Sequence, residues 1–122
     1  MATFVEFVST LNSAKQQAIF WHNQTTSYST HKALNNWYDG IVGHLDGLVE
    51  SVAGIYGRPV GYSVVEPTDW TSTEDTIAYF KNLYQYVQTE RKSIYQESWV
   101  QNIIDEIAAD IAQTLYLLTL NK

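Results

Sequence analysis

The chain has 122 residues, the length of one domain, and we expect residues 1–122 to form a single domain. Thirteen acidic residues against seven Lys and Arg give a formal net charge of -6. This balance argues against DNA binding, which needs clustered cations. The absence of Cys excludes disulfides, thiolate metal sites and Cys nucleophiles. No apolar run approaches the ~20 residues of a membrane span, and the N-terminus does not resemble a signal peptide, so we expect a cytoplasmic protein.

Two helices are predicted in the first half of the chain. Apolar residues recur at alternating spacings of three and four, which predicts a helix over about 3–24. The stretch 23–27 is polar and favours a turn. A second apolar pattern predicts a helix over about 28–55, and Gly57 with Pro59 just beyond it are stop signals.

The segment 57–71 is predicted to be a long crossover. It contains two Gly and two Pro, so we expect an irregular loop with room for a short turn of helix. Val60–Val65 is the only stretch with the character of a strand. A connection of this length can carry the chain from one end of a helical bundle to the other.

The remaining residues predict two further helices. A capping box of Thr71 with Glu74, or of Ser72 with Asp75, would begin the third helix. A fourth apolar pattern predicts a helix over about 97–120. The expected fold is therefore an all-α four-helix bundle with a long crossover between the second and third helices.

The candidate metal ligands are two His and a group of polar residues along the second helix. His22 lies at the end of the first predicted helix and His31 in the first turn of the second, so an antiparallel hairpin brings them close together. Asp46 and Glu50 are four residues apart and share a helical face. With His31 they belong to one polar stripe, which also includes Asn35 and Asp39.

The distance along the second helix decides whether His31 and Asp46 of one chain can bind the same metal ion. His31 and Asp46 are separated by fifteen residues, roughly 22 Å at about 1.5 Å each, whereas transition-metal ligands lie about 2 Å from the ion. One chain therefore cannot place both residues on one metal. A second copy related by a two-fold axis can, and the symmetry then produces two sites per dimer.

The pattern H-x8-H-x14-D-x3-E, formed by His22, His31, Asp46 and Glu50, resembles the Dps family (DNA-binding proteins from starved cells) of ferritin-like proteins. The resemblance implies a four-helix bundle that assembles as a dimer or as a twelve-subunit cage. It implies that the two His of one subunit and the two acids of its neighbour bind iron, Fe(II) or Fe(III), with other divalent metals as alternatives. It also implies a ferroxidase reaction with peroxide or dioxygen, followed by iron storage. Trp21 or Trp37 would shield the site or donate electrons.

One departure from the family pattern supports a different function. The family usually has a carboxylate four residues after the second His, where this chain has the neutral Asn35; Asp39, one turn later, is a weaker substitute. The alternative is a non-catalytic helical assembly module with a degenerate site, in which Asp46 and Glu50 are solvated surface charges. Family members that bind DNA often use a Lys-rich N-terminal tail, and this chain has only Lys15 near its start, so we expect no strong DNA binding.

Three further features of the helices need an interpretation. Gly40, Gly43, Gly47 and Gly54 lie within about 60° of one another on the second helix, which predicts either a close neighbour or a bend. His44 lies away from the acidic stripe and is interpreted as a separate contact. The pair Glu106 and Asp110 shares a face of the fourth helix without an accompanying His, and we interpret it as surface.

Overall fold

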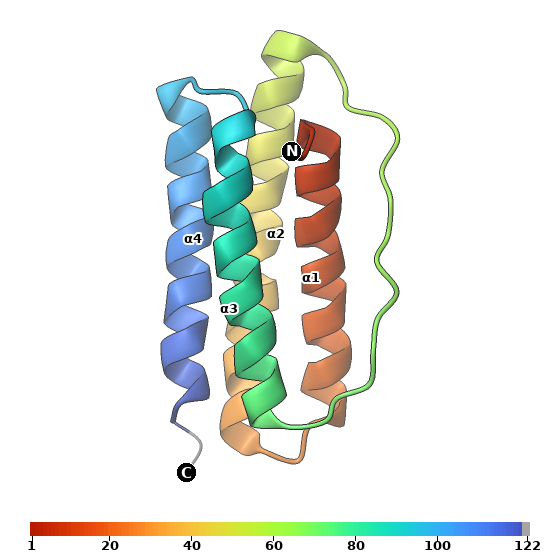
Figure 1. Ribbon diagram of the computed structural model, residues 1–122, viewed down its shortest axis with the longest axis vertical. Helices are drawn as coiled ribbons and strands as arrows, with labels where there is room; N and C mark the ends of the chain where they lie inside the picture. Colours follow the sequence, from red (N-terminus) through yellow and green to blue (C-terminus); the bar gives the residue numbers. More distant parts are fainter. Residues whose placement is uncertain (121–122) are drawn as a thin grey trace.

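Four α-helices run along a common axis (Figure 1). The computed structural model describes residues 1–120, which form α1 (Phe4–Gln24), α2 (Tyr28–Tyr56), α3 (Thr73–Glu90), the short 3-10 turn η1 (Arg91–Ser93) and α4 (Ser98–Leu118). The pairs α1–α2 and α3–α4 are antiparallel, whereas α2 and α3 run in the same direction (Figure 1). The prediction of an all-α arrangement of four helices is confirmed, and no strand occurs within residues 1–120. In the same range, no helix has both the length and the apolar character needed to cross a membrane.

Side chains at the helix ends explain where the helices begin and stop. Thr3 and Glu6 form a complete capping box at the start of α1, in which the Glu6 amide donates to Thr3 Oγ1 at 3.2 Å and the Thr3 amide donates to Glu6 Oε1 at 2.8 Å. Ser72 caps α3 by accepting a hydrogen bond from the amide of Asp75 at 3.0 Å, which decides between the two predicted caps. Gly57 ends α2 with φ of 92°, a left-handed conformation that favours glycine.

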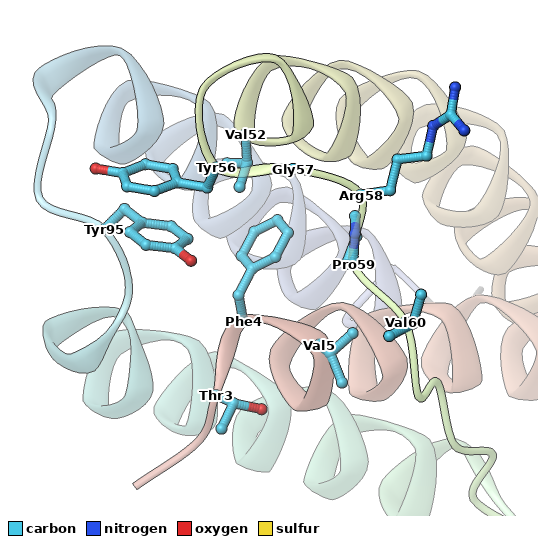
Figure 2. Close-up of a pocket in the computed structure, with 10 residues that line it drawn as sticks. All are labelled: Thr3, Phe4, Val5, Val52, Tyr56, Gly57, Arg58, Pro59, Val60 and Tyr95. Carbon is cyan, nitrogen blue, oxygen red and sulfur yellow. The ribbon is translucent and has the colours of Figure 1, made fainter.

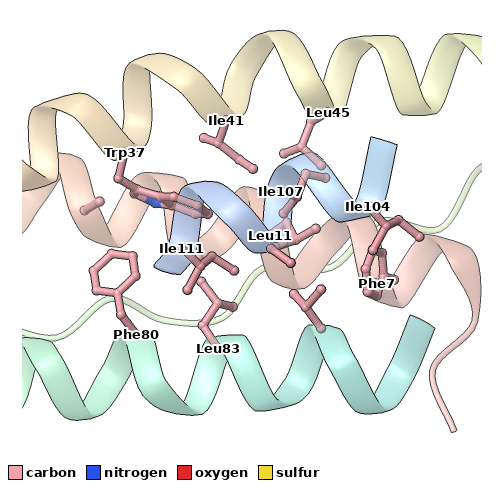
Figure 3. Packing of buried hydrophobic residues seen from close by; sticks show 14 of the residues in the cluster. Phe7, Leu11, Trp37, Ile41, Leu45, Phe80, Leu83, Ile104, Ile107 and Ile111 are labelled. Atoms are coloured by element: carbon pink, nitrogen blue, oxygen red, sulfur yellow. The ribbon is translucent and has the colours of Figure 1, made fainter. Parts of the chain in front are cut away.

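The core is a continuous apolar cluster to which all four helices contribute (Figure 3). Trp37 of α2 meets Phe80 of α3 edge to face, with ring centroids 5.5 Å apart at 79°. Both rings are almost fully buried, and burying a large apolar side chain contributes about 1.5–3 kcal/mol. The other labelled members are Phe7, Leu11, Ile41, Leu45, Leu83, Ile104, Ile107 and Ile111.

The crossover between α2 and α3, residues 57–72, runs along the outside of α1 and is called the strap below (Figure 1). It contains neither helix nor strand, so the expected short turn of helix is wrong and Val60–Val65 forms no strand. Polar side chains of α1 hold the strap instead. Gln17 both donates to the Thr68 carbonyl at 2.9 Å and accepts from the Thr68 amide at 2.8 Å. Two serines one and two turns earlier accept strap amides at 3.0 Å, Ser13 from Val65 and Ser9 from Ser63.

Candidate metal centre

His22 and His31 are brought together by the short connection between α1 and α2. The amide of Thr25 donates to the Trp21 carbonyl at 2.9 Å and ends α1. Ser27 accepts from the amide of Thr30 at 3.2 Å and begins α2. The two imidazole rings then stack, with centroids 3.7 Å apart and planes 20° apart. The close approach expected from the hairpin is therefore observed.

Each imidazole is fixed by the backbone of the other residue. His22 Nδ1 donates to the His31 carbonyl at 2.9 Å, and His31 Nδ1 donates to the His22 carbonyl at 2.8 Å. A carbonyl can only accept, so each ring carries a proton on Nδ1, and in the neutral form of the ring Nε2 has the lone pair. Metal-binding His residues are commonly oriented in this way by a carbonyl behind the ring.

The surroundings of the pair are aromatic and partly open. Tyr38 meets His22 edge to face at 5.2 Å, and Tyr28 lies beside His31 with centroids 6.2 Å apart. His31 and Tyr28 line a surface hollow of about 280 Å³ together with the connection 25–27. Both imidazoles are half-buried, so this end of the bundle is accessible to a small ion.

The acidic residues of α2 lie elsewhere, on its solvent-exposed face. Asp46 and Glu50 are both exposed, and neither forms a hydrogen bond or an ion pair with a side chain in residues 1–120. Asn35, half-buried, accepts from Tyr38 Oη at 2.8 Å and donates to Asp39 Oδ2 at 3.1 Å. Both polar ends of the Asn35 amide are therefore engaged within α2.

A single chain does not complete a metal site from these residues. Within residues 1–120, no group of three or more His, Asp or Glu side chains is placed to hold a metal ion. The His pair and the two acids belong to the same helix hairpin but to separate parts of it. The imidazoles alone offer two nitrogen donors.

Most of the glycine edge of α2 faces open space. Apart from its chain neighbours and the backbone of its own helix, a Cβ added at Gly43, Gly47 or Gly54 would meet no atom of residues 1–120 within 4 Å, whereas one at Gly40 would lie 3.6 Å from Asp110 Oδ2. Within residues 1–120 nothing packs closely against this edge, and even at Gly40 the contact would be an ordinary van der Waals one. At the other three positions, no neighbour comes from residues 1–120.

His44 joins α2 to α4 in a cluster that the sequence interpretation missed. His44 Nδ1 lies 2.8 Å from Asp110 Oδ2, and His44 Nε2 lies 3.3 Å from Glu106 Oε1. The contact with Asp110 lacks the alignment of a hydrogen bond, although both atoms are buried. The expectation that no His accompanies the acidic pair is therefore wrong, although Glu106 is exposed as expected, and His44 does make a contact separate from the acidic stripe. The four-residue spacing of Glu106 and Asp110 was the only signal in the sequence. It could not identify His44 as their partner without knowing that α2 packs against α4.

The two tryptophans considered as electron donors have other contacts. Trp21 Nε1 donates to the Thr68 carbonyl of the strap at 2.7 Å. Trp37 lies in the core, and its buried Nε1 has no hydrogen-bond partner within residues 1–120. Trp21 directly precedes His22, whereas Trp37 packs against Phe80.

The comparisons with known proteins identify a family without a described function. No curated protein and no solved structure matches the sequence significantly. The model of a family of unknown function, DUF5856, matches residues 22–118, a range that begins at His22 and includes His31, Asp46 and Glu50. Because this range covers well over half of its residues, the chain belongs to this family of unknown function, DUF5856.

Proposed function

We propose that the chain is a Dps-like, ferritin-like protein that binds Fe(II) at sites shared between two copies and supports its oxidation and storage. The proposal rests chiefly on the stacked pair His22 and His31, whose Nδ1 atoms are held by carbonyls while both Nε2 atoms remain available to a ligand. Iron would be the substrate of this site.

The donor set suits iron chemistry. Imidazole and carboxylate ligands bind Fe(II), and also Zn(II) and Mn(II). With few protein ligands, the remaining positions would be open to peroxide or dioxygen, which would take the electrons that Fe(II) releases. The formal net charge of -6 favours the approach of cations.

The missing ligands would come from a second copy. Asp46 and Glu50 are exposed on the outward face of α2 and unpaired within residues 1–120. On the same helix, Gly43 and Gly47 leave room for another backbone to approach. A two-fold axis beside this face would bring the acids of each copy to the imidazoles of the other. It would form two equivalent sites.

The second candidate is a non-catalytic helical assembly module, and one observation favours it. Asn35, at the position where the family usually has a carboxylate, uses both ends of its amide in hydrogen bonds to Tyr38 and Asp39. It is therefore not free to act as a third ligand on the His side of the site. In this alternative the bundle and its self-association are retained and iron is not oxidised.

A complementation experiment tests the shared site directly. One variant carries His22→Gln and His31→Gln, and the other carries Asp46→Asn and Glu50→Gln. Anaerobic titration with Fe(II) is expected to show no tight site in either variant alone. After the variants are mixed and allowed to exchange subunits, mixed dimers contain one intact site each, and about a quarter of the wild-type capacity returns.

His44, the third His of the chain, supplies the control variant, and two results would contradict the shared site. His44→Gln changes a side chain whose contacts are to Glu106 and Asp110, so its iron capacity is expected to equal that of the wild type. If the mixture stays as inactive as its parts while the wild type binds iron, the site is not shared in this way. If the His double variant binds iron normally, the imidazoles are not ligands.

The mass of the assembled particle and its rate of Fe(II) oxidation distinguish the iron function from the assembly module. A dodecamer of the 13.9 kDa chain that oxidises Fe(II) supports the iron function. An oligomer that neither binds nor oxidises Fe(II) supports the assembly module. Asn35→Asp, which restores the usual carboxylate, is expected to raise Fe(II) oxidation only in the first case.

A further inference from the structure

Two tyrosines stack at the opposite end of the bundle from the His pair. Tyr56, in the last turn of α2, and Tyr95, between η1 and α4, have ring centroids 3.9 Å apart and planes 10° apart. Their hydroxyl groups point in opposite directions (Figure 2). Phe4 packs against Tyr95 at 5.8 Å, which adds a third ring to the cluster.

The Tyr56 hydroxyl donates a hydrogen bond to the carboxylate of Glu97. Glu97 is the N-cap residue of α4, yet its side chain makes no capping bond. No other tyrosine hydroxyl in residues 1–120 donates to a carboxylate: Tyr38 donates to an amide oxygen, and Tyr86 bonds the Thr10 hydroxyl. This phenol therefore has a proton acceptor of its own.

The resting state of the pair is a protonated phenol beside a carboxylate. The hydrogen bond to Glu97 is the main cause that raises the pKa of Tyr56 above its usual 10.0. At neutral pH the proton thus remains on the phenol. Removing an electron from a phenol makes it strongly acidic, so the proton must then leave, and an adjacent acceptor assists that transfer.

We propose that Tyr56, Glu97 and Tyr95 form a proton-coupled one-electron donor site. An outer-sphere oxidant takes one electron from Tyr56, the phenol O–H bond breaks, and the proton passes to the Glu97 carboxylate. The products are a neutral tyrosyl radical, a protonated Glu97 and the oxidant reduced by one electron. The stacked ring of Tyr95 stabilises the electron-poor ring of Tyr56 through its π-system.

A small oxidant can reach the site from solvent. Tyr56 is 48% exposed. Beside it lies an open pocket of about 240 Å³, which Arg58 and both stacked tyrosines help to line (Figure 2). This site is independent of iron binding by the His pair.

The experiment uses hexachloroiridate(IV), an anionic one-electron oxidant, at less than one equivalent per chain. Stopped-flow absorbance follows the loss of the oxidant, electron paramagnetic resonance detects the tyrosyl radical, and peptide mass spectrometry locates the oxidised residue. In the wild type, Tyr56 is expected to be the first residue oxidised. The rate is expected to be independent of buffer base and to fall in deuterated water, because the proton moves with the electron.

Conservative variants distinguish this role from a structural one. Tyr56→Phe is expected to abolish the fast phase. Glu97→Gln keeps a hydrogen-bond acceptor but is a poor base, and it is expected to slow the phase about tenfold or more and make it depend on buffer base, since a positioned base contributes about 10²–10⁴. Tyr95→Leu removes the stacked ring and is expected to slow the fast phase as well.

The matched control is Tyr62→Phe, since Tyr62 is 50% exposed but has neither a stacked ring nor a carboxylate partner among the described residues. It is expected to leave the fast phase unchanged. An unchanged fast phase in Tyr56→Phe would overturn the proposal. Equal rates and isotope effects in the wild type and Glu97→Gln, with normal helical circular dichroism, would overturn it as well.

Discussion

Gln17 is the side chain through which α1 holds the strap most firmly, so its truncation gives a quantitative test. The residue is 6% exposed. Its amide joins Thr68 in three hydrogen bonds, two of them with the Thr68 backbone at 2.8 and 2.9 Å. In Gln17→Ala, the Thr68 amide and hydroxyl lose their partner, whereas the Thr68 carbonyl keeps the bond from the Trp21 indole.

The size of the effect follows from these bonds. The third bond, from the Thr68 hydroxyl at 3.3 Å, is long and is neglected. A net contribution of about 1 kcal/mol for each of the two shorter bonds lowers the free energy of unfolding by about 2 kcal/mol. That loss corresponds to roughly a thirtyfold change in the unfolding equilibrium. Gln24→Ala is the matched control, because Gln24 also makes two strap bonds but is exposed to water, and we expect less than about 0.5 kcal/mol.

Urea unfolding followed by circular dichroism measures both variants, and amide hydrogen exchange at Thr68 reports the strap locally. Exchange at this amide is expected to accelerate in Gln17→Ala before global unfolding. A Gln17→Ala variant as stable as the wild type, or one no less stable than Gln24→Ala, would show that the strap is not held by this side chain.

Three further predictions concern charge and packing. Burial raises the pKa of Tyr79 from 10.0 to about 12, so its contribution to stability is complete below pH 10 and is lost as the pH rises towards 12. Between about pH 9 and 12, the free energy of unfolding measured in urea should therefore fall by about 2–3 kcal/mol more in the wild type than in Tyr79→Phe. Parallel curves for the two proteins would refute this. His44→Ala removes the imidazole whose Nδ1 lies 2.8 Å from Asp110 Oδ2, and because both side chains are partly exposed it is expected to cost about 0.5–1 kcal/mol. Adding Asp110→Ala should recover part of that loss in a double-mutant cycle, and strictly additive losses would contradict the pairing. The Cβ added by Gly43→Ala or Gly47→Ala meets no atom of residues 1–120 beyond its chain neighbours and its own helix backbone, so each substitution should stabilise the helix by up to about 1 kcal/mol. In sedimentation experiments both should weaken self-association, and an unchanged oligomer would exclude this edge as the contact.

Local sequence signals were sufficient for the helices and for one part of the candidate site. Apolar periodicity and caps act within a few residues, so the prediction of α2 over about 28–55 lies within one residue of the observed Tyr28–Tyr56. The approach of His22 to His31 was also predictable, because only residues 25–27 separate the two helices that carry them. The binding role of these residues stays a prediction.

Tertiary structure alone decided the contacts between segments that are distant in sequence. His44 meets Glu106 and Asp110 because α2 packs against α4, a pairing that no local pattern specifies. The stack of Tyr56 on Tyr95 likewise depends on where the crossover returns the chain.

The strap shows the same division between local and distant interactions. The sequence determined that a Gly- and Pro-containing segment would cross the bundle. Its path is set by hydrogen bonds that strap amides donate to α1 side chains more than fifty residues away, such as that of Ser63 to Ser9. Local propensity fixes which backbone conformations are available, and long-range packing and hydrogen bonding select one arrangement among them.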